Sequence, residues 1–311
     1  MIPGNFLEDN SFMAWIIIPS HLQIETINGV CTARCLMCPF PTWTRKPQLM
    51  GVQTFIAIMN KFLPYRNQIQ YLSLFGCGEP LLDKELAVKV KIAKDMGFKG
   101  IGTATNCTEL STLKSYELLE AGMDTIICGV DGVTKATHEA VRIGTNFEKV
   151  VKNILGFIKM RPAFGKTKMI VRFIRQKANA HEWPEFKAFW TERLNPEYGD
   201  SVVAYDIVDY DGKVADYSSK TTLADVEVPR ECEEISKRIT VFSDGGIQLC
   251  CADHNGKFNL GSALTGDPIT IYSTGLFAHY RRMIGEGRIE ELELCNTCTI
   301  PRSFKLKDKI K

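Results

Sequence analysis

The sequence predicts an α/β protein: a partial (β/α)6 TIM-like barrel followed by a small C-terminal domain. Two observations predict this fold. From about residue 22 to about residue 210, short runs rich in Ile, Val and Leu alternate with longer amphipathic stretches. Such alternation is typical of buried parallel strands connected by helices. Six units are too few to close an eight-stranded barrel, and right-handed crossovers would curl them into an open one.

The candidate strands are mostly bounded by Gly, Asn or Asp, and an amphipathic stretch follows most of them. We expect each stretch to form a helix that covers the outside of the sheet. The strands are expected at Leu22–Ile27, Gln70–Phe75, Gly100–Thr105, Thr125–Val130, Met169–Ile174 and Val202–Val208. The helices are expected at Val52–Tyr65, Lys84–Met96, Leu110–Ala121, Phe147–Met160 and Glu182–Leu194.

The pattern changes beyond residue 212, where a polar, irregular stretch indicates a linker. The segment after it has short strands, one helix near Leu276–Ile284 and cysteines close to both ends. A segment of this size buries little core alone, so a metal group is expected to hold it together. The predicted division is a barrel at 1–215, a linker at 216–230, a small domain at 231–301 and a basic tail at 302–311.

Composition excludes some kinds of partner. The 311 residues carry 38 basic and 36 acidic side chains, a net charge of +2, so no basic footprint for nucleic acid or a membrane surface is expected. The apolar run from Met13 to Pro19 is short and has no basic leader. It therefore predicts neither a signal peptide nor a spanning helix, and we expect a cytoplasmic protein.

Eleven cysteines are the unusual feature of the composition. Without an export signal, uneven and clustered cysteines favour metal or redox use over disulfides. Seven of them fall into two groups with the spacing of metal ligands. The first group is Cys31, Cys35 and Cys38, and the second is Cys232, Cys250, Cys295 and Cys298.

The first group directly follows the first candidate strand, at the end where barrel enzymes gather catalytic groups. Three thiolates on a short loop can bind three irons of a [4Fe–4S] cluster and leave the fourth iron open. A zinc site would close with a fourth ligand, yet no Cys or His lies between Cys38 and Cys77. The CxxxCxxC spacing resembles that of the radical S-adenosylmethionine (SAM) superfamily, although Met37 stands where that family often has an aromatic residue.

The resemblance implies that the open iron binds SAM and that SAM is cleaved to a 5′-deoxyadenosyl radical, which abstracts hydrogen from an unactivated C–H bond. Reduced flavodoxin or ferredoxin is the implied electron donor. Gly76-Cys77-Gly78-Glu79-Pro80 ends the second strand and resembles the GGEP motif, whose carboxylate meets the SAM amino group. Residues that follow the third and fourth expected strands, and one residue in the helical region after them, resemble further SAM contacts of that family. The implied SAM-binding residues are Gly76, Gly78, Glu79, Asn106, Asp131 and Arg142.

The second group has intervals of 18, 45 and 3 residues. Four thiolates form a closed set, suited to a fully ligated [4Fe–4S] cluster or to structural zinc, and spacing alone does not choose between them. The segment resembles a twitch domain, the shortened SPASM domain, which implies one auxiliary [4Fe–4S] cluster. Its intervals are similar to those of twitch-type aminocyclitol dehydrogenases, which implies an oxidoreductase that oxidises a small hydroxylated substrate such as a sugar or aminocyclitol.

Four cysteines remain outside the two groups: Cys77, Cys107, Cys128 and Cys251. Packing is the default role of a buried thiol. Cys77 ends the second strand and Cys251 neighbours a predicted ligand, so either could be a catalytic thiol that returns a hydrogen atom to a substrate radical. That role would belong to a radical epimerase, one alternative to the dehydrogenase. A maturase that modifies ribosomal peptides and a non-enzymatic iron–sulfur carrier are the others.

Overall fold

The computed structural model describes residues 16–206 and 229–300, except 297 and 299. All six expected strands have a counterpart in this part of the chain, and these run parallel to one another in one sheet; the last two residues expected in the sixth strand, 207 and 208, lie outside the described residues. The sheet order is β10-β9-β7-β6-β5-β1-β11-β12. Its first six strands in chain order are β1 (His21–Ile24), β5 (Tyr71–Leu74), β6 (Ile101–Thr105), β7 (Thr125–Gly129), β9 (Lys168–Arg175) and β10 (Ser201–Asp206).

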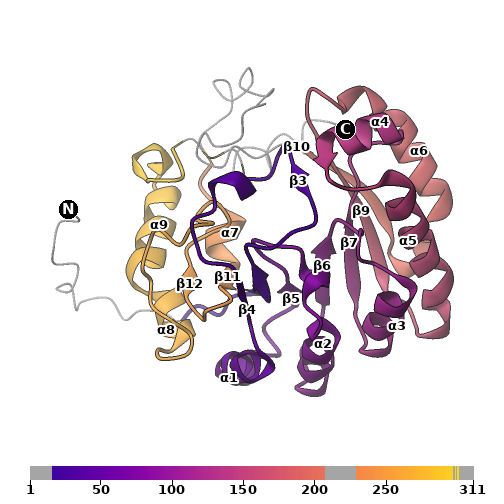
Figure 1. Ribbon diagram of the computed structural model, residues 1–311. Helices are drawn as coiled ribbons and strands as arrows, with labels where there is room; N and C mark the ends of the chain where they lie inside the picture. Colours follow the sequence, from indigo (N-terminus) through magenta and orange to yellow (C-terminus); the bar gives the residue numbers. More distant parts are fainter. Residues whose placement is uncertain (1–15, 207–228, 297, 299, 301–311) are drawn as a thin grey trace.

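The expected helices cover the outer face of the sheet (Figure 1). Apolar residues on their inner faces, such as Phe55, Leu118 and Phe157, are fully buried against the strands. The partial-barrel prediction is therefore confirmed. The helices are α1 (Val52–Phe62), α2 (Leu86–Asp95), α3 (Thr112–Glu120), α5 (Phe147–Met160) and α6 (Trp183–Arg193).

Local sequence sets where these helices begin and end. Ser111 and Asn146 cap α3 and α5, because their side chains accept hydrogen bonds from backbone N–H groups that have no partner within the helix. Pro64 follows α1, and the chain tightens there into a 3-10 turn. Within the barrel, helix α4 (Lys135–Val141) was not expected; it has only seven residues, and Thr134 caps it. The 3-10 turns are Phe40–Thr42, Leu63–Tyr65, Pro80–Leu82, Arg161–Ala163, Ala180–Glu182, Pro196–Tyr198 and Ile289–Glu291.

The C-terminal segment extends the same sheet. Its first strand, β11 (Arg238–Val241), pairs in parallel with β1, and β12 (Ile247–Gln248) then pairs antiparallel with β11. Helices α8 (Pro268–Ser273) and α9 (Gly275–Gly285) lie beside these strands at one end of the molecule (Figure 1), and α7 (Glu233–Ser236) leads into β11. The division into two domains stays a prediction, since the segment completes the sheet and also carries its own cysteine group.

Two short ladders fix the loops at the carboxyl ends of the strands. β2 (Ile27–Asn28) pairs with β4 (Gln48–Leu49), and β3 (Arg34–Cys35) pairs with β8 (Arg142–Ile143). The second ladder places Cys35 directly opposite Arg142. These ladders position the loop that carries the first cysteine group.

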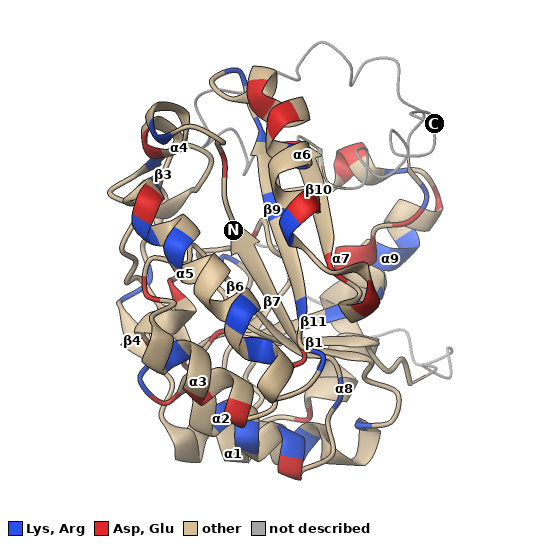
Figure 2. Ribbon diagram, turned by 90° about the vertical axis from the view of Figure 1, so that its right-hand side faces the viewer, with Lys and Arg blue, Asp and Glu red and all other residues tan. Residues whose placement is uncertain are grey.

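The surface carries both signs of charge. Blue Lys and Arg positions and red Asp and Glu positions are interspersed along the ribbons of α2, α3 and α5 in Figure 2, in keeping with the small net charge. Within the described residues, no helix combines the length and the apolar character that crossing a bilayer requires.

Candidate functional site

The loop Cys31–Cys38 brings three thiols together at the carboxyl end of β1. Cys38 donates its backbone N–H to the carbonyl of Cys35 at 3.0 Å, and the N–H of Ala33 points at the Cys31 sulfur at 3.4 Å. Burial raises the pKa of all three thiols, and mutual repulsion adds to the rise at Cys38, whose pKa reaches about 12. A positive group bound at the sulfurs would stabilise the thiolate forms, as metal ligation by cysteine requires.

Arg142 supplies positive charge beside the thiols. Its Nη1 lies 3.7 Å from the Cys35 sulfur, and its Nε is 2.7 Å from Oδ2 of Asp131. Burial raises the pKa of Asp131 and the Arg142 guanidinium opposes the rise, while the second carboxylate oxygen accepts the Ile174 N–H at 2.6 Å. Both residues were expected to contact SAM, and the structure joins them to each other and to the cysteine loop.

Asn106 and Glu79 form a second support for that loop. The Asn106 amide donates to the Thr32 hydroxyl at 2.9 Å and lies 3.7 Å from the Cys31 sulfur. Its backbone N–H donates to Glu79, whose carboxylate also accepts the Thr105 hydroxyl at 2.6 Å and the Leu81 N–H at 3.1 Å. Burial raises the pKa of Glu79, and these hydrogen bonds oppose the rise. The carboxylate thus has three donors from its own chain, which fix its position.

Gly76 and Gly78 are needed because other parts of the chain approach them closely. A Cβ on Gly76 would lie 2.5 Å from Cγ of Glu25, and one on Gly78 would lie 2.8 Å from the carbonyl oxygen of Ile27. The motif that was expected to cradle SAM therefore also packs against the residues that follow β1. This packing fixes the backbone of the motif beside the cysteine loop.

The structure brings the four C-terminal cysteines together. Cys232 precedes α7, Cys250 follows β12, and Cys295 and Cys298 form a turn in which the N–H of Cys298 donates to the carbonyl of Cys295. Burial raises the pKa of Cys250, and the other three thiols raise it further. Residues up to 66 positions apart thus face one another, as a shared metal group requires.

Neither group is arranged around a single ion. Across the described residues, no three Cys, His, Asp or Glu side chains converge as the ligands of one metal ion do.

The two proposed catalytic thiols lie in different places. Cys77 contacts the backbone carbonyl of His254 at 3.8 Å, and Cys38 and Arg45 are among its electrostatic neighbours, which places it next to the first group. Cys251 has Glu234, Cys250 and Cys298 as neighbours, so it lies with the second group. Burial raises the pKa of both thiols, which keeps them protonated and able to donate hydrogen.

Sequence reasoning missed Glu25 and Arg45. Glu25 immediately follows β1 and is 1% exposed, and Arg45 forms an ion pair with it at 2.5 Å. An acidic residue at the end of a buried strand was the available signal.

Comparison with known proteins gives a family for part of the chain. Residues 26–171 match the model of the Radical SAM superfamily. A 151-residue stretch is 30% identical to 7,8-dihydro-6-hydroxymethylpterin dimethyltransferase of Methanocaldococcus jannaschii, covering 44% of this chain and 29% of that protein. A 139-residue stretch is 27% identical to a probable GTP 3′,8-cyclase of Sulfurisphaera tokodaii, covering 44% and 43%. The chain thus spans less than half of these curated relatives.

Solved structures with a similar fold cover nearly the whole chain. BtrN in complex with AdoMet and 2-DOIA has a TM-score of 0.61 at 18% identity, over 90% of this chain and 93% of that one. SuiB of Streptococcus suis bound to the precursor peptide SuiA has a TM-score of 0.69 at 14% identity, over 92% and 71%. Native anSMEcpe with bound AdoMet has a TM-score of 0.65 at 16% identity, over 89% of each chain.

Proposed function

We propose, from the match of residues 26–171 to the model of the Radical SAM superfamily, that the protein is a two-cluster oxidoreductase acting on a small hydroxylated substrate. Cys31, Cys35 and Cys38 would hold a [4Fe–4S] cluster, and Cys232, Cys250, Cys295 and Cys298 an auxiliary one. With SAM on the first cluster and an electron from reduced flavodoxin or ferredoxin, the site would supply a 5′-deoxyadenosyl radical able to abstract hydrogen from a C–H bond. The observation that carries the proposal is the convergence of Arg142 and Asn106 on the sulfurs of the triad.

The chain's own residues prepare this site. N–H groups aimed at thiolate sulfurs stabilise the charge of the cluster and tune its potential. Arg142 and Asn106 have this role toward Cys35 and Cys31. Asp131 and Glu79 hold those two donors in place.

Recognition of SAM falls to the same strand ends. The Glu79 carboxylate has three chain donors for two oxygens, which leaves capacity for one more donor, such as the SAM ammonium group. Gly76 and Gly78 keep the adjacent backbone free of side chains, while Asn106 and Asp131 follow β6 and β7, and Arg142 in β8 pairs with Asp131.

The auxiliary group supports oxidation. A fully ligated cluster cannot bind substrate through iron, so it would supply one-electron acceptance. Dehydrogenation of an alcohol removes a hydrogen atom, a proton and one further electron, which requires such an acceptor. The likeness in fold to BtrN, seen with AdoMet and 2-DOIA, extends over 93% of that chain and supports a small substrate, such as a sugar or aminocyclitol.

Two specific observations favour other outcomes. SuiB, seen with a precursor peptide, has the higher TM-score of 0.69, which favours a peptide substrate. The position of the Cys77 thiol beside the triad favours hydrogen return, and hence an epimerase.

One anaerobic experiment separates these functions. The protein is reconstituted with iron and sulfide, its metals are counted, and 5′-deoxyadenosine is measured with SAM, reductant and candidate substrates. We expect about eight irons per chain and about four in Cys295→Ala. Cys128→Ala, which removes a buried thiol outside both groups, is the control and should keep its iron.

The redox state of the product then decides the reaction class. An oxidised product supports the dehydrogenase, and a redox-neutral product that requires Cys77 or Cys251 supports the epimerase. About four irons together with zinc would contradict the auxiliary cluster. Turnover of a peptide but of no sugar or aminocyclitol would replace the proposed substrate.

A further inference from the structure

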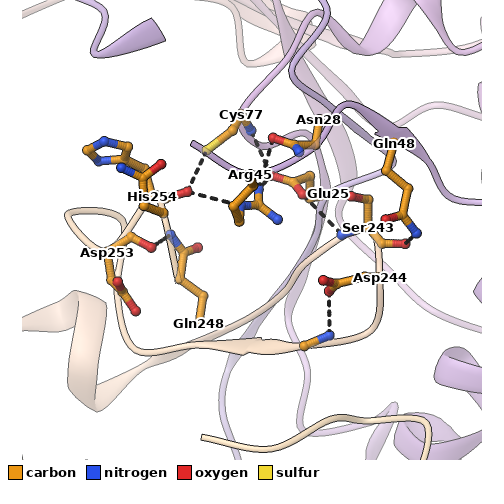
Figure 3. Close-up of polar contacts among 12 residues, drawn as sticks. Glu25, Asn28, Arg45, Gln48, Cys77, Ser243, Asp244, Gln248, Asp253 and His254 are labelled. Carbon is orange, nitrogen blue, oxygen red and sulfur yellow. Dashed lines mark hydrogen bonds and ion pairs between the residues drawn. The ribbon is translucent and has the colours of Figure 1, made fainter. Parts of the chain in front are cut away.

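A buried carboxylate joins three separate parts of the site. Glu25 accepts hydrogen bonds from Arg45 Nη2 at 2.5 Å and from the Cys77 N–H at 3.0 Å on one oxygen (Figure 3). Its other oxygen accepts both the N–H and the hydroxyl of Ser243, each at 3.0 Å. These donors come from the loop after the cysteine triad, from the end of β5 and from the end of β11. One side chain thus holds three segments together.

The guanidinium of Arg45 makes contacts in several directions at once. Its Nη2 also donates to Oδ1 of Asn28, and its Nε donates to the backbone carbonyl of His254, both at 3.1 Å. Its plane lies over the Phe242 ring, 3.7 Å from the centroid. A planar fork can satisfy this arrangement, whereas a lysine ammonium cannot reach all of these partners.

The two segments that Arg45 joins are those next to the two cysteine groups. Arg45 lies in the loop that follows Cys38, and residues 242–255 include the predicted auxiliary ligand Cys250. Two further sets of contacts bind the same surfaces together. Asn255 accepts the Thr44 N–H at 2.8 Å and donates to the Thr42 carbonyl at 2.9 Å, and Gln48 donates to the Ser243 carbonyl at 3.3 Å.

Cys77 lies in the same contact region, between the loop that follows Cys38 and residues 242–255. Its sulfur contacts the His254 carbonyl at 3.8 Å, on the oxygen that also accepts from Arg45 (Figure 3). Cys38 lies close enough to act on the Cys77 thiol electrostatically. The Cys77 thiol and the Arg45 guanidinium thus contact the same backbone oxygen of the segment that carries Cys250.

We propose that Arg45, held by Glu25, is the positioning residue that docks residues 242–255 against the triad loop and thereby fixes the spacing of the two clusters. The inference rests on the proposed two-cluster function for the clusters and on the structure alone for the docking. A buried carboxylate with four donors resists movement, because separating the segments would leave it uncompensated. Spacing matters to function because the electron leaving the substrate must reach its acceptor.

The test compares Arg45→Gln with wild type and with Arg288→Gln, all reconstituted. Arg288 is an exposed arginine of the same C-terminal segment that pairs with Glu286 and Glu291. Two readouts apply: amide hydrogen exchange over residues 242–255, and the magnetic interaction between the reduced clusters in electron paramagnetic resonance. We expect exchange about tenfold faster or more in Arg45→Gln and a weaker magnetic interaction at full iron content. Arg288→Gln should match wild type.

Three possible results bear on the docking role of Arg45. Wild-type exchange and magnetic interaction in Arg45→Gln would overturn the proposal. If Arg45→Gln does not fold, Arg45→Lys keeps the charge beside Glu25 and should show faster exchange over the same residues; unchanged exchange there would overturn it. If wild type holds only about four irons, the two-cluster function fails, and the exchange measurements still decide the docking role of Arg45.

Discussion

Cys107 occupies a backbone conformation that side chains rarely adopt, and this predicts an unusual response to glycine. Its φ is +62°, and its side chain is fully buried at the turn that follows β6. Cys128 is equally buried in the neighbouring strand β7, does not have a positive φ, and its thiol interacts with that of Cys107. The two positions therefore form a matched pair, and the perturbation is substitution of each by Ala and by Gly.

The magnitude follows from what separates Ala from Gly at each position. At Cys128, Gly should be less stable than Ala by about 1.5 kcal/mol, the sum of one buried methyl group and the added freedom of the unfolded chain. At Cys107 the same loss is offset by relief of left-handed strain, which is about 1–2 kcal/mol. We therefore expect the Gly and Ala variants to differ little at Cys107. The thiol–thiol contact is lost in all four variants and cancels.

Urea unfolding of the four variants and wild type, under anaerobic reducing conditions and without metal, measures these differences. At each position, the glycine penalty is the free energy of unfolding of the Ala variant minus that of the Gly variant. The decisive quantity is the penalty at Cys128 minus the penalty at Cys107. We expect about 1–2 kcal/mol. An equal glycine penalty at both positions would show that the turn stores no strain and would refute the reasoning.

Three further predictions concern the scaffold of the site. Burial raises the pKa of Glu182, but hydrogen bonds from Thr134, Thr137 and the Val133 N–H outweigh it and leave the pKa below its usual value. Wild type should therefore exceed Glu182→Gln by about 1–3 kcal/mol at pH 7, and unfolding at a series of pH values should show this gap closing as the pH falls through the folded pKa; a gap that widens toward acid contradicts it. Lys89→Met leaves the fully buried Asp83 carboxylate without its cation and should cost about 3–5 kcal/mol in urea unfolding, whereas a loss below about 1 kcal/mol would mean that water reaches the pair. Gly78→Ala, with its Cβ 2.8 Å from a backbone oxygen, should lower stability by about 1–3 kcal/mol; Gly156→Ala, in α5 with open space around it, should raise stability slightly, and equal effects would contradict the packing argument.

Much of the fold follows from local patterns in the sequence. The six strands and five long helices were predictable because the buried side of each element requires apolar residues at a characteristic spacing, and that spacing is visible in the sequence. α4 was missed because a helix of seven residues is too short to show a helical spacing of apolar residues. The pairing of β11 with β1 was missed for a different reason: a four-residue strand carries no information about a partner that tertiary docking selects.

The features of the site also divide into those that the sequence predicts and those that only the folded structure reveals. The cysteine groups follow from spacing and the strand-end residues from the resemblance to family motifs, and the structure brings the cysteines of each group together. The mutual pairing of Asp131 with Arg142 needed the β3–β8 ladder, which forms only when two distant loops meet. The Glu25–Arg45 pair depends on three segments at once, and no local pattern encodes such a junction.

The place of β11 beside β1 has a consequence for how the chain matures during synthesis. His21 contacts Ser73 across 52 residues of sequence on one side of β1, but it contacts Arg238 across 217 residues on the other. A nascent chain can thus pair β1 with β5 early, while the opposite edge of β1 keeps its backbone groups unpaired until β11, 217 residues later, has left the ribosome. Open strand edges recruit other strands, and distant pairings form slowly. We therefore expect this protein to be most exposed to aggregation in the interval before β11 pairs with β1.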